Sequence, residues 1–206
     1  NFPSEARAAF WRAVQVWERH ISSSVPIVIE ANWESLGERV LGSAGPLIAS
    51  FDSNNDGVID TFLGLPLFDA VTGQNQFESQ VDIDIVASFN RDRGDWHFGE
   101  EPAPAGTIDF TSIVLHEIGH GLNYTSVLNY DTGFGGYGFD INDSGQIDED
   151  ERLPGPFTKS LVEEQPGGSQ LSLVNENEFP NPSVELGDAL TSDRLFFTGN
   201  RSEEAA

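Results

Sequence analysis

Residues 109–122 read Asp-Phe-Thr-Ser-Ile-Val-Leu-His-Glu-Ile-Gly-His-Gly-Leu, and we interpret the rest of the chain around them. Asp109 or the earlier Thr107 can cap a helix here, because both side chains accept hydrogen bonds from unpaired backbone N–H groups. The interior of this helix, residues 110–115, is apolar enough to be buried. His116 and His120 are four residues apart, so a helix places both imidazoles on one face, one turn apart. The segment therefore predicts a buried helix that presents two imidazoles to one ion.

Zinc is the ion that this pattern favours, since imidazole nitrogens at this spacing are typical zinc ligands. Glu117 is rotated by about 100° from His116 around the helix, so its carboxylate can hold a water rather than the metal. Zinc lowers the pKa of such a water and polarises a carbonyl, and Glu117 would pass the water proton to the leaving amine. A chance match is the alternative. However, the chain has only four histidines, and an unpaired imidazole on an apolar helix would be costly.

Hydrophobic periodicity predicts further elements before this helix. Residues 4–21 should form a helix capped by Ser4, because their apolar side chains recur at helical spacing. That stripe consists of Phe10, Val14, Trp17 and Ile21. Residues 27–33 and 81–90 alternate apolar and polar side chains, which predicts two strands, the second a half-buried antiparallel or edge strand. Residues 42–80, rich in Gly, Asn and Asp, are expected to be irregular.

The chain after the histidine helix is predicted to be loop-rich. Short helices are expected at residues 158–164 and 186–195. Neither an internal repeat nor a break in composition divides the chain, so we expect one domain over residues 1–206. Its N-terminal part, 1–122, would hold the sheet and the histidine helix, and its C-terminal part, 123–206, a calcium loop.

These elements together resemble the matrixin-like metzincins, on the strand at 81–89, Asp109-Phe110 and the segment His116–Leu122. The resemblance implies an α+β fold with a small mixed or antiparallel sheet, a backing helix near the N-terminus and an active-site helix. The chain also resembles a group of secreted bacterial proteins with a tail of Asn-Pro-Ser and Leu-Thr-Ser, here residues 181–183 and 190–192. The two resemblances together imply a secreted zinc endopeptidase whose strand 81–89 binds an extended peptide substrate by strand addition.

The chain departs from the metzincin pattern after the second histidine. Asn123 replaces a glycine, Ser126 stands where a third histidine is expected, and the chain contains no methionine for the turn beneath the metal. Because a serine hydroxyl is a poor zinc ligand, the third ligand must come from elsewhere. The candidates are His97, Asp131, Glu163 and Glu164. Alternatively, Tyr130 and Tyr137 could cover the ion or stabilise an oxyanion.

Residues 140–151 fit the twelve-position calcium loop of the EF-hand. The ligands would be Asp140, Asn142, Ser144, the carbonyl of Gln146, Asp148 and Glu151. Gly145 would supply the sharp turn at the sixth position. The alternative is a solvated acidic loop.

Residues 52–60 repeat the first nine positions of such a loop. The ligands of this weaker calcium site would be Asp52, Asn54, Asp56, the carbonyl of Val58 and Asp60. Leu63 stands where the bidentate glutamate belongs, and its loss weakens the site. Calcium would offset repulsion among these carboxylates and order loops that have no disulfide to hold them.

Composition limits the partners and the compartment. A net charge of -24, with 34 acidic and 10 basic residues, disfavours nucleic acid and anionic lipid and attracts cations. The chain has no cysteine, which excludes disulfides and thiolate sites and favours a bacterial source for a secreted protein. We find no apolar run near 18 residues, so membrane insertion is not expected. The first residue, Asn1, suggests a mature or excised fragment.

Two functions follow from these observations. The first is a secreted zinc endopeptidase stabilised by calcium. The alternative is a non-catalytic extracellular module, a structural, adhesion or filament component that binds calcium on a degenerate protease scaffold. Self-association is left open by the sequence. The missing third histidine and methionine turn motivate the alternative.

Overall fold

The computed structural model describes residues 2–75, 83–141 and 144–198. The fold is mixed α+β, with five α-helices and several small sheets in these ranges, which confirms the predicted class. The chain forms two compact units, each built from two segments. Unit 1 comprises Asn1–Ala49 and Gly64–Tyr124, and unit 2 comprises Ser50–Leu63 and Thr125–Ala206. The expected division at residue 122 lies close to the last crossing between them, and the single-domain interpretation stays a prediction.

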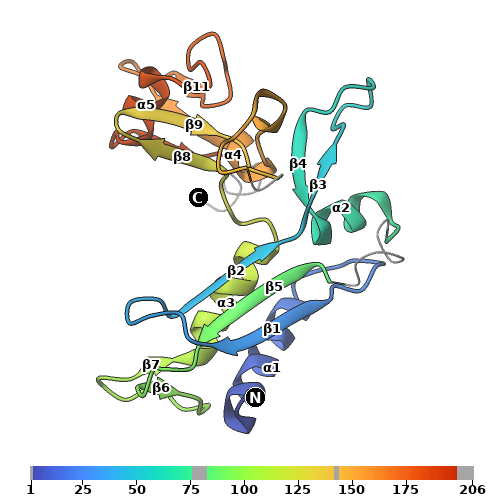
Figure 1. The fold of residues 1–206 in the computed structure, drawn as a ribbon, viewed down its shortest axis with the longest axis vertical. Coiled ribbons are helices and arrows are strands. Elements are labelled where there is room, and N and C mark those ends of the chain that lie inside the picture. Colours follow the sequence, from blue (N-terminus) through green and yellow to red (C-terminus); the bar gives the residue numbers. More distant parts are fainter. Residues whose placement is uncertain (1, 76–82, 142–143, 199–206) are drawn as a thin grey trace. The chain divides into compact units, whose positions relative to one another are not determined.

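Unit 1 contains a mixed three-stranded sheet with β5 (Ile85–Asn90) in its centre (Figure 1). On one side β1 (Ile29–Glu34) runs parallel to it, and on the other β2 (Gly42–Pro46) runs antiparallel. The predicted strands at 27–33 and 81–90 are confirmed in part of their length, although residues 81 and 82 lie outside the described residues. The predicted edge position is wrong, because β5 is paired on both sides. Its apolar side chains point into the core, which explains the alternation in sequence.

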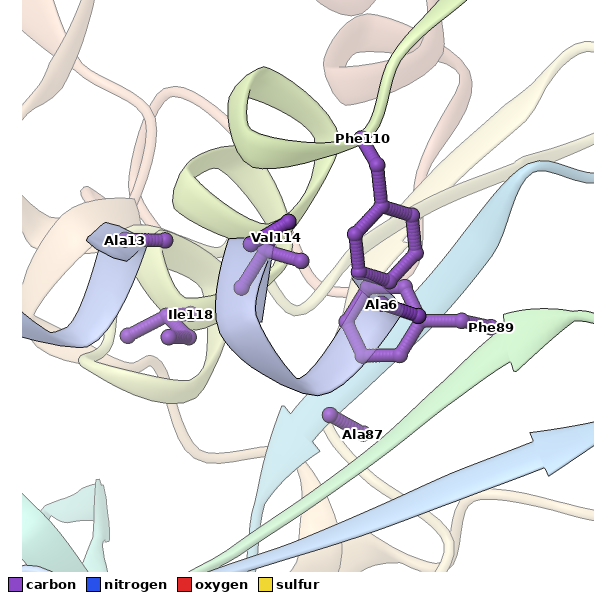
Figure 2. Packing of buried hydrophobic residues seen from close by; sticks show 8 residues of the cluster. Ala6, Ala13, Ala87, Phe89, Phe110, Val114 and Ile118 are labelled. Atoms are coloured by element: carbon purple, nitrogen blue, oxygen red, sulfur yellow. The ribbon is translucent and has the colours of Figure 1, made fainter. Parts of the chain in front are cut away.

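Helices α1 (Ser4–Glu18) and α3 (Phe110–Gly121) pack together and against the sheet. Three alanines of α1 are fully buried and allow this close approach: Ala6, Ala9 and Ala13. Figure 2 shows side chains of one buried cluster, with Ala6 and Ala13 from α1, Val114 and Ile118 from α3, and Ala87 and Phe89 from β5. The predicted stripe of larger side chains is only partly buried, because the alanine face makes the closest contact. Ser4 is not the cap, since Pro3 precedes the first helical turn.

An aromatic cluster surrounds Phe110, which is fully buried at the start of α3. Five rings meet it edge-on, with centroid distances between 5.1 and 6.3 Å: Phe2, Trp33, Phe89, Trp96 and Phe98. Trp96 belongs to the short strand β6 (Trp96–His97), which pairs in parallel with β7 (Ile108–Asp109) just before α3. The cluster therefore fixes the N-terminal end of the histidine helix.

The prediction that residues 42–80 are irregular is wrong for much of this region, although residues 52–60 form a loop and residues 76–80 lie outside the described residues. This region contains β2, a pair of strands, β3 (Ile48–Phe51) and β4 (Thr61–Gly64), and helix α2 (Leu65–Thr72). Tertiary pairing overrides the weak strand preference of Gly and Pro in β2. The chain passes from unit 1 to unit 2 within β3 and returns within β4.

Unit 2 contains the hairpin of β8 (Leu128–Asp131) and β9 (Phe134–Tyr137), and a three-stranded antiparallel sheet. In that sheet β10 (Leu161–Glu164) lies between β11 (Gln170–Ser172) and β12 (Leu195–Phe197). The helical segments are the 3-10 turn η1 (Glu149–Glu151), α4 (Pro156–Lys159) and α5 (Val184–Leu190). The helix expected at 158–164 is therefore wrong beyond Lys159, because the following residues pair in the sheet. The helix expected at 186–195 ends at Leu190.

The Asn-Pro-Ser segment, residues 181–183, forms hydrogen bonds with β9 and with the first turn of α5. The Asn181 amide accepts a hydrogen bond from Tyr137 N and donates one to Tyr137 O, each at 2.9 Å. The Ser183 hydroxyl caps α5 by accepting from Leu186 N at 3.0 Å. These bonds border the core of unit 2, which consists of Tyr137, Leu161, Leu173, Phe179, Leu186 and Ala189.

Candidate metal centre

Helix α3 turns one side to the core of unit 1 and leaves its histidines on the other. The Asp109 carboxylate accepts hydrogen bonds from Thr111 N at 3.3 Å and Ser112 N at 3.1 Å, which confirms Asp109 as the cap. Phe110, Val114 and Ile118 then follow at helical spacing and are buried. The side chains of His116 and His120 lie on the more exposed side.

The two imidazoles converge. The Nε2 atoms of His116 and His120 are 3.0 Å apart, and the ring planes are inclined at 87°. Two nitrogens that bind one tetrahedral zinc ion at about 2.0–2.1 Å lie roughly 3.3 Å from each other. The observed spacing is thus within a few tenths of an ångström of the spacing that a shared ion requires.

The far side of the His120 ring is held by the backbone. Its Nδ1 atom lies 2.9 Å from the carbonyl oxygen of Tyr124. Because a carbonyl only accepts, Nδ1 carries a proton, which in the neutral ring leaves the lone pair on Nε2. The chain turns back at Asn123, whose φ of 74° is left-handed, and this turn brings the Tyr124 carbonyl under the ring. His120 is therefore held in the tautomer that a metal ligand needs.

Glu117 lies beside the imidazole pair and is nearly buried, with 7% of its surface exposed. Burial raises the pKa of its carboxyl above the usual value, while the charges of His116 and His120 and the backbone N–H of Ala44 act in the opposite direction. Gly42 leaves room for this carboxylate, since a Cβ there would lie 3.1 Å from Glu117 Cγ. The site thus combines two converging nitrogens with a carboxylate whose pKa is raised by burial.

The candidates for a third ligand make other contacts or lie in unit 2. His97 Nε2 is 2.8 Å from the carbonyl oxygen of Glu101 in its own loop. Glu163 is buried in β10, where Arg194 and Gln165 bind its two carboxylate oxygens at 2.6 and 2.7 Å. Asp131 and Glu164 end strands β8 and β10. Within residues 2–75, 83–141 and 144–198, no three His, Asp or Glu side chains gather as a potential metal site.

The other side chains considered near the motif also belong to unit 2. Tyr137 is buried and its hydroxyl donates to Glu176 at 3.2 Å, and burial together with the Glu176 charge raises its pKa to about 12. Tyr130 is 54% exposed on β8. The Ser126 hydroxyl lies 3.2 Å from that of Thr158.

The position of β5 changes the expected route for a peptide. A strand paired on both sides has no backbone edge to offer, so strand addition along residues 85–90 is excluded. The outer strand that packs on α3 is β2, and its Ala44 N–H reaches Glu117. An extended ligand beside Glu117 would therefore meet β2.

Loop 140–151 is tied together by its first and twelfth residues. The Asp140 carboxylate accepts from Ser144 N at 3.0 Å and Gly145 N at 2.7 Å, and Gly145 has a φ of 83°. The carboxylate of Glu151, only 2% exposed, accepts from Ile141 N at 3.0 Å and Asp148 N at 2.9 Å. The expected ligand Asn142 lies outside the described residues. Ser144 donates to the carbonyl of Gln146 at 3.0 Å.

Loop 52–60 repeats the first half of this arrangement. The Asp52 carboxylate accepts from Asp56 N at 3.2 Å and Gly57 N at 2.6 Å, and Gly57 has a φ of 90°. In both loops the first residue thus accepts from the fifth and sixth. The second half differs, because Asp60 accepts from Ser53 N and Leu63 is buried at the twelfth position.

Sequence reasoning missed the backbone groups of the site. Ala44 N–H and the Tyr124 carbonyl act through main-chain atoms, which no residue type identifies. The one available signal is the run of small residues Gly42-Ser-Ala-Gly45, which permits close approach of a strand to α3.

Comparison of the chain with protein-family models, curated proteins and solved structures gave no match in any of the three. None of the helices in the described residues has the length and apolar character needed to cross a membrane.

Proposed function

We propose that the protein is an extracellular zinc-dependent endopeptidase with a metzincin-like active-site helix. His116 and His120 would hold the zinc ion, and Glu117 would act as general base and general acid. The observation that carries the proposal is the 3.0 Å approach of the two Nε2 atoms, with the Nδ1 proton of His120 fixed by Tyr124. This pairing suits a common ion, because the two Nε2 atoms approach each other beside a carboxylate at nearly the spacing of two zinc ligands.

Zinc bound there would supply a Lewis acid and a water activated near neutral pH. Glu117 would take a proton from that water and return it to the amine of the departing peptide. A carboxylate in a desolvated position is a stronger base than one in water, so the raised pKa of Glu117 suits both steps. The Ala44 N–H and the space left by Gly42 position this carboxylate.

The substrate would be an extended peptide that adds to the outer edge of β2. Main-chain hydrogen bonds give such binding its affinity without demanding a particular sequence. The Ala44 N–H that now contacts Glu117 lies on that edge, so a bound peptide would pass next to the carboxylate. Strand β2, rather than the strand at 81–89, takes the role of the substrate-binding strand.

Calcium would order unit 2 through loop 140–151. The support for this role is that the carboxylates of Asp140 and Glu151, at the first and twelfth positions, both accept hydrogen bonds from backbone N–H groups of the loop. A net charge of -24 makes a divalent ion favourable there, and millimolar calcium outside cells suits a structural site. This is the support for an extracellular location.

A non-catalytic calcium-binding module is the second candidate. It is favoured by one observation, that no third His, Asp or Glu joins the histidine pair within the part of the chain that the structure describes. Two imidazoles alone bind zinc weakly. Proteolysis together with stoichiometric zinc would support the peptidase, and calcium without zinc would support the module.

The proposal is tested by Glu117→Ala. We expect cleavage of an unfolded protein substrate to fall about 10²- to 10⁴-fold, because the general base is removed. Zinc content should stay unchanged, since Glu117 is not a ligand. Glu100→Ala, an exposed glutamate in unit 1, serves as the matched control. Unchanged cleavage by Glu117→Ala would contradict the mechanism.

A further inference from the structure

The chain contains a single lysine, Lys159, and the structure places it against one of the two acidic loops of unit 2. Lys159 is the last residue of α4. Its Nζ atom lies 3.5 Å from Asp60 Oδ2 and 3.4 Å from Ser53 Oγ, and it donates a hydrogen bond to Thr61 Oγ1. The ammonium group is thus surrounded by three oxygen atoms of one hairpin.

Both carboxylate oxygens of Asp60 make polar contacts within this hairpin or with Lys159. Oδ1 accepts from Ser53 N at 2.9 Å, and Oδ2 accepts from Ser53 Oγ at 2.6 Å and faces Lys159. Together with the Lys159 charge, these bonds lower the pKa of Asp60 to about 2. The carboxylate at the ninth position of the loop is therefore ionised and already paired.

The two acidic loops differ where a calcium site is closed. Loop 140–151 ends on the carboxylate of Glu151, whereas loop 52–60 is followed by Leu63, which is apolar and buried. Loop 140–151 has no lysine among its residues, because Lys159 is the only one in the chain. The loop that lacks the twelfth-position carboxylate is the loop that receives the ammonium group.

We propose that the ammonium of Lys159 is the built-in cation of loop 52–60, so that this loop keeps its conformation without calcium. The tethered charge neutralises part of the repulsion among Asp52, Asp56 and Asp60 at any calcium concentration. This replaces the expectation of a second, weaker calcium site. The lysine proposal rests on the proposed calcium role of loop 140–151 in one respect, which is the comparison between the two loops.

The first test counts calcium ions by titration calorimetry on the whole chain. We expect one calcium per chain, lost in Glu151→Gln and unchanged in Asp56→Asn. A second calcium that disappears in Asp56→Asn would overturn the proposal. If no calcium binds at all, the calcium part of the proposed function fails, while the lysine proposal is still decided by the second test.

The second test removes the ammonium by Lys159→Met in buffer with a calcium chelator. We expect amide exchange at residues 53–60 to become about two- to fivefold faster, because a partly exposed ion pair is lost. Lys159→Arg should keep the slower exchange. Arg91→Met removes the same charge from an exposed pair in unit 1 and serves as the control. Exchange in Lys159→Met equal to that in Arg91→Met would overturn the proposal.

Discussion

Units 1 and 2 reach a folded state by different physical means. Unit 1 packs two helices and a sheet around fully buried aromatic rings, and its histidine helix belongs to that core. Unit 2 has a separate core, and in two of its loops, 52–60 and 140–151, a carboxylate accepts hydrogen bonds from backbone N–H groups. The difference teaches that the candidate zinc site is held by apolar packing, whereas the acidic loops are held by hydrogen bonds from backbone N–H groups to carboxylates. All four tryptophans lie in unit 1, so their fluorescence reports on that unit alone.

The largest loss of stability is expected when a ring is removed from the aromatic core of unit 1. Phe110→Ala should lower the free energy of unfolding by about 3–5 kcal/mol, because a fully buried ring with five edge-on neighbours is lost. Urea titration followed by tryptophan fluorescence measures this loss. Val71→Ala, at an exposed position in unit 1, is the control. A loss below about 1 kcal/mol would show that the core does not carry the site.

An alkaline transition should distinguish unit 2. The pKa of Tyr137 is raised to about 12 in the folded chain, against about 10 when unfolded. A raised pKa adds stability that is complete below pH 10 and is lost as the pH rises towards 12. The contribution is up to about 2.7 kcal/mol.

Amide exchange in unit 2 between pH 9 and 12, compared with Tyr137→Phe, measures this term. The variant lacks the ionisable hydroxyl, so its stability should fall less steeply over that interval. Parallel curves for the two proteins would mean that Tyr137 does not couple ionisation to folding.

The smallest effect is expected from calcium. At a calcium concentration ten times the dissociation constant, binding should stabilise unit 2 by about 1.4 kcal/mol. Glu151→Gln should abolish this gain, because it removes charge from the carboxylate that closes loop 140–151. Glu149→Gln changes an exposed neighbour and should keep it. Amide exchange of residues 125–141 measures the gain, and tryptophan fluorescence should not respond. If calcium slowed amide exchange in unit 1 and not in unit 2, the proposed calcium role of loop 140–151 would be contradicted.

The elements with strong local signals were predictable from sequence. Helix α3 has an aspartate cap, an apolar interior and a clear end. Strands β1 and β5 were predictable because their apolar and polar side chains alternate. The convergence of His116 and His120 follows from helical spacing alone. Spacing could not supply the Tyr124 carbonyl, because the turn at Asn123 depends on backbone conformation.

The misses share a physical cause, which is that tertiary contacts overrode local preference. Strand β2 contains two glycines and a proline and has no apolar alternation, yet pairing with β5 makes it a strand. Residues 161–164 pair with β11 and β12, and this draws Glu163 to Arg194 rather than to an exposed helix face. The contact of Lys159 with Asp60 joins residues 99 positions apart, and no local pattern encodes it.

The most direct test of the account is the zinc content of the purified chain, measured by elemental analysis at equilibrium with a saturating concentration of free zinc, in the parent and in single histidine variants. We predict one zinc per chain in the parent and in His97→Ala, and a loss of zinc in His116→Ala and in His120→Ala. A parent without zinc after exposure to the metal, or histidine variants that retain it, would contradict the claim that these two imidazoles bind one ion.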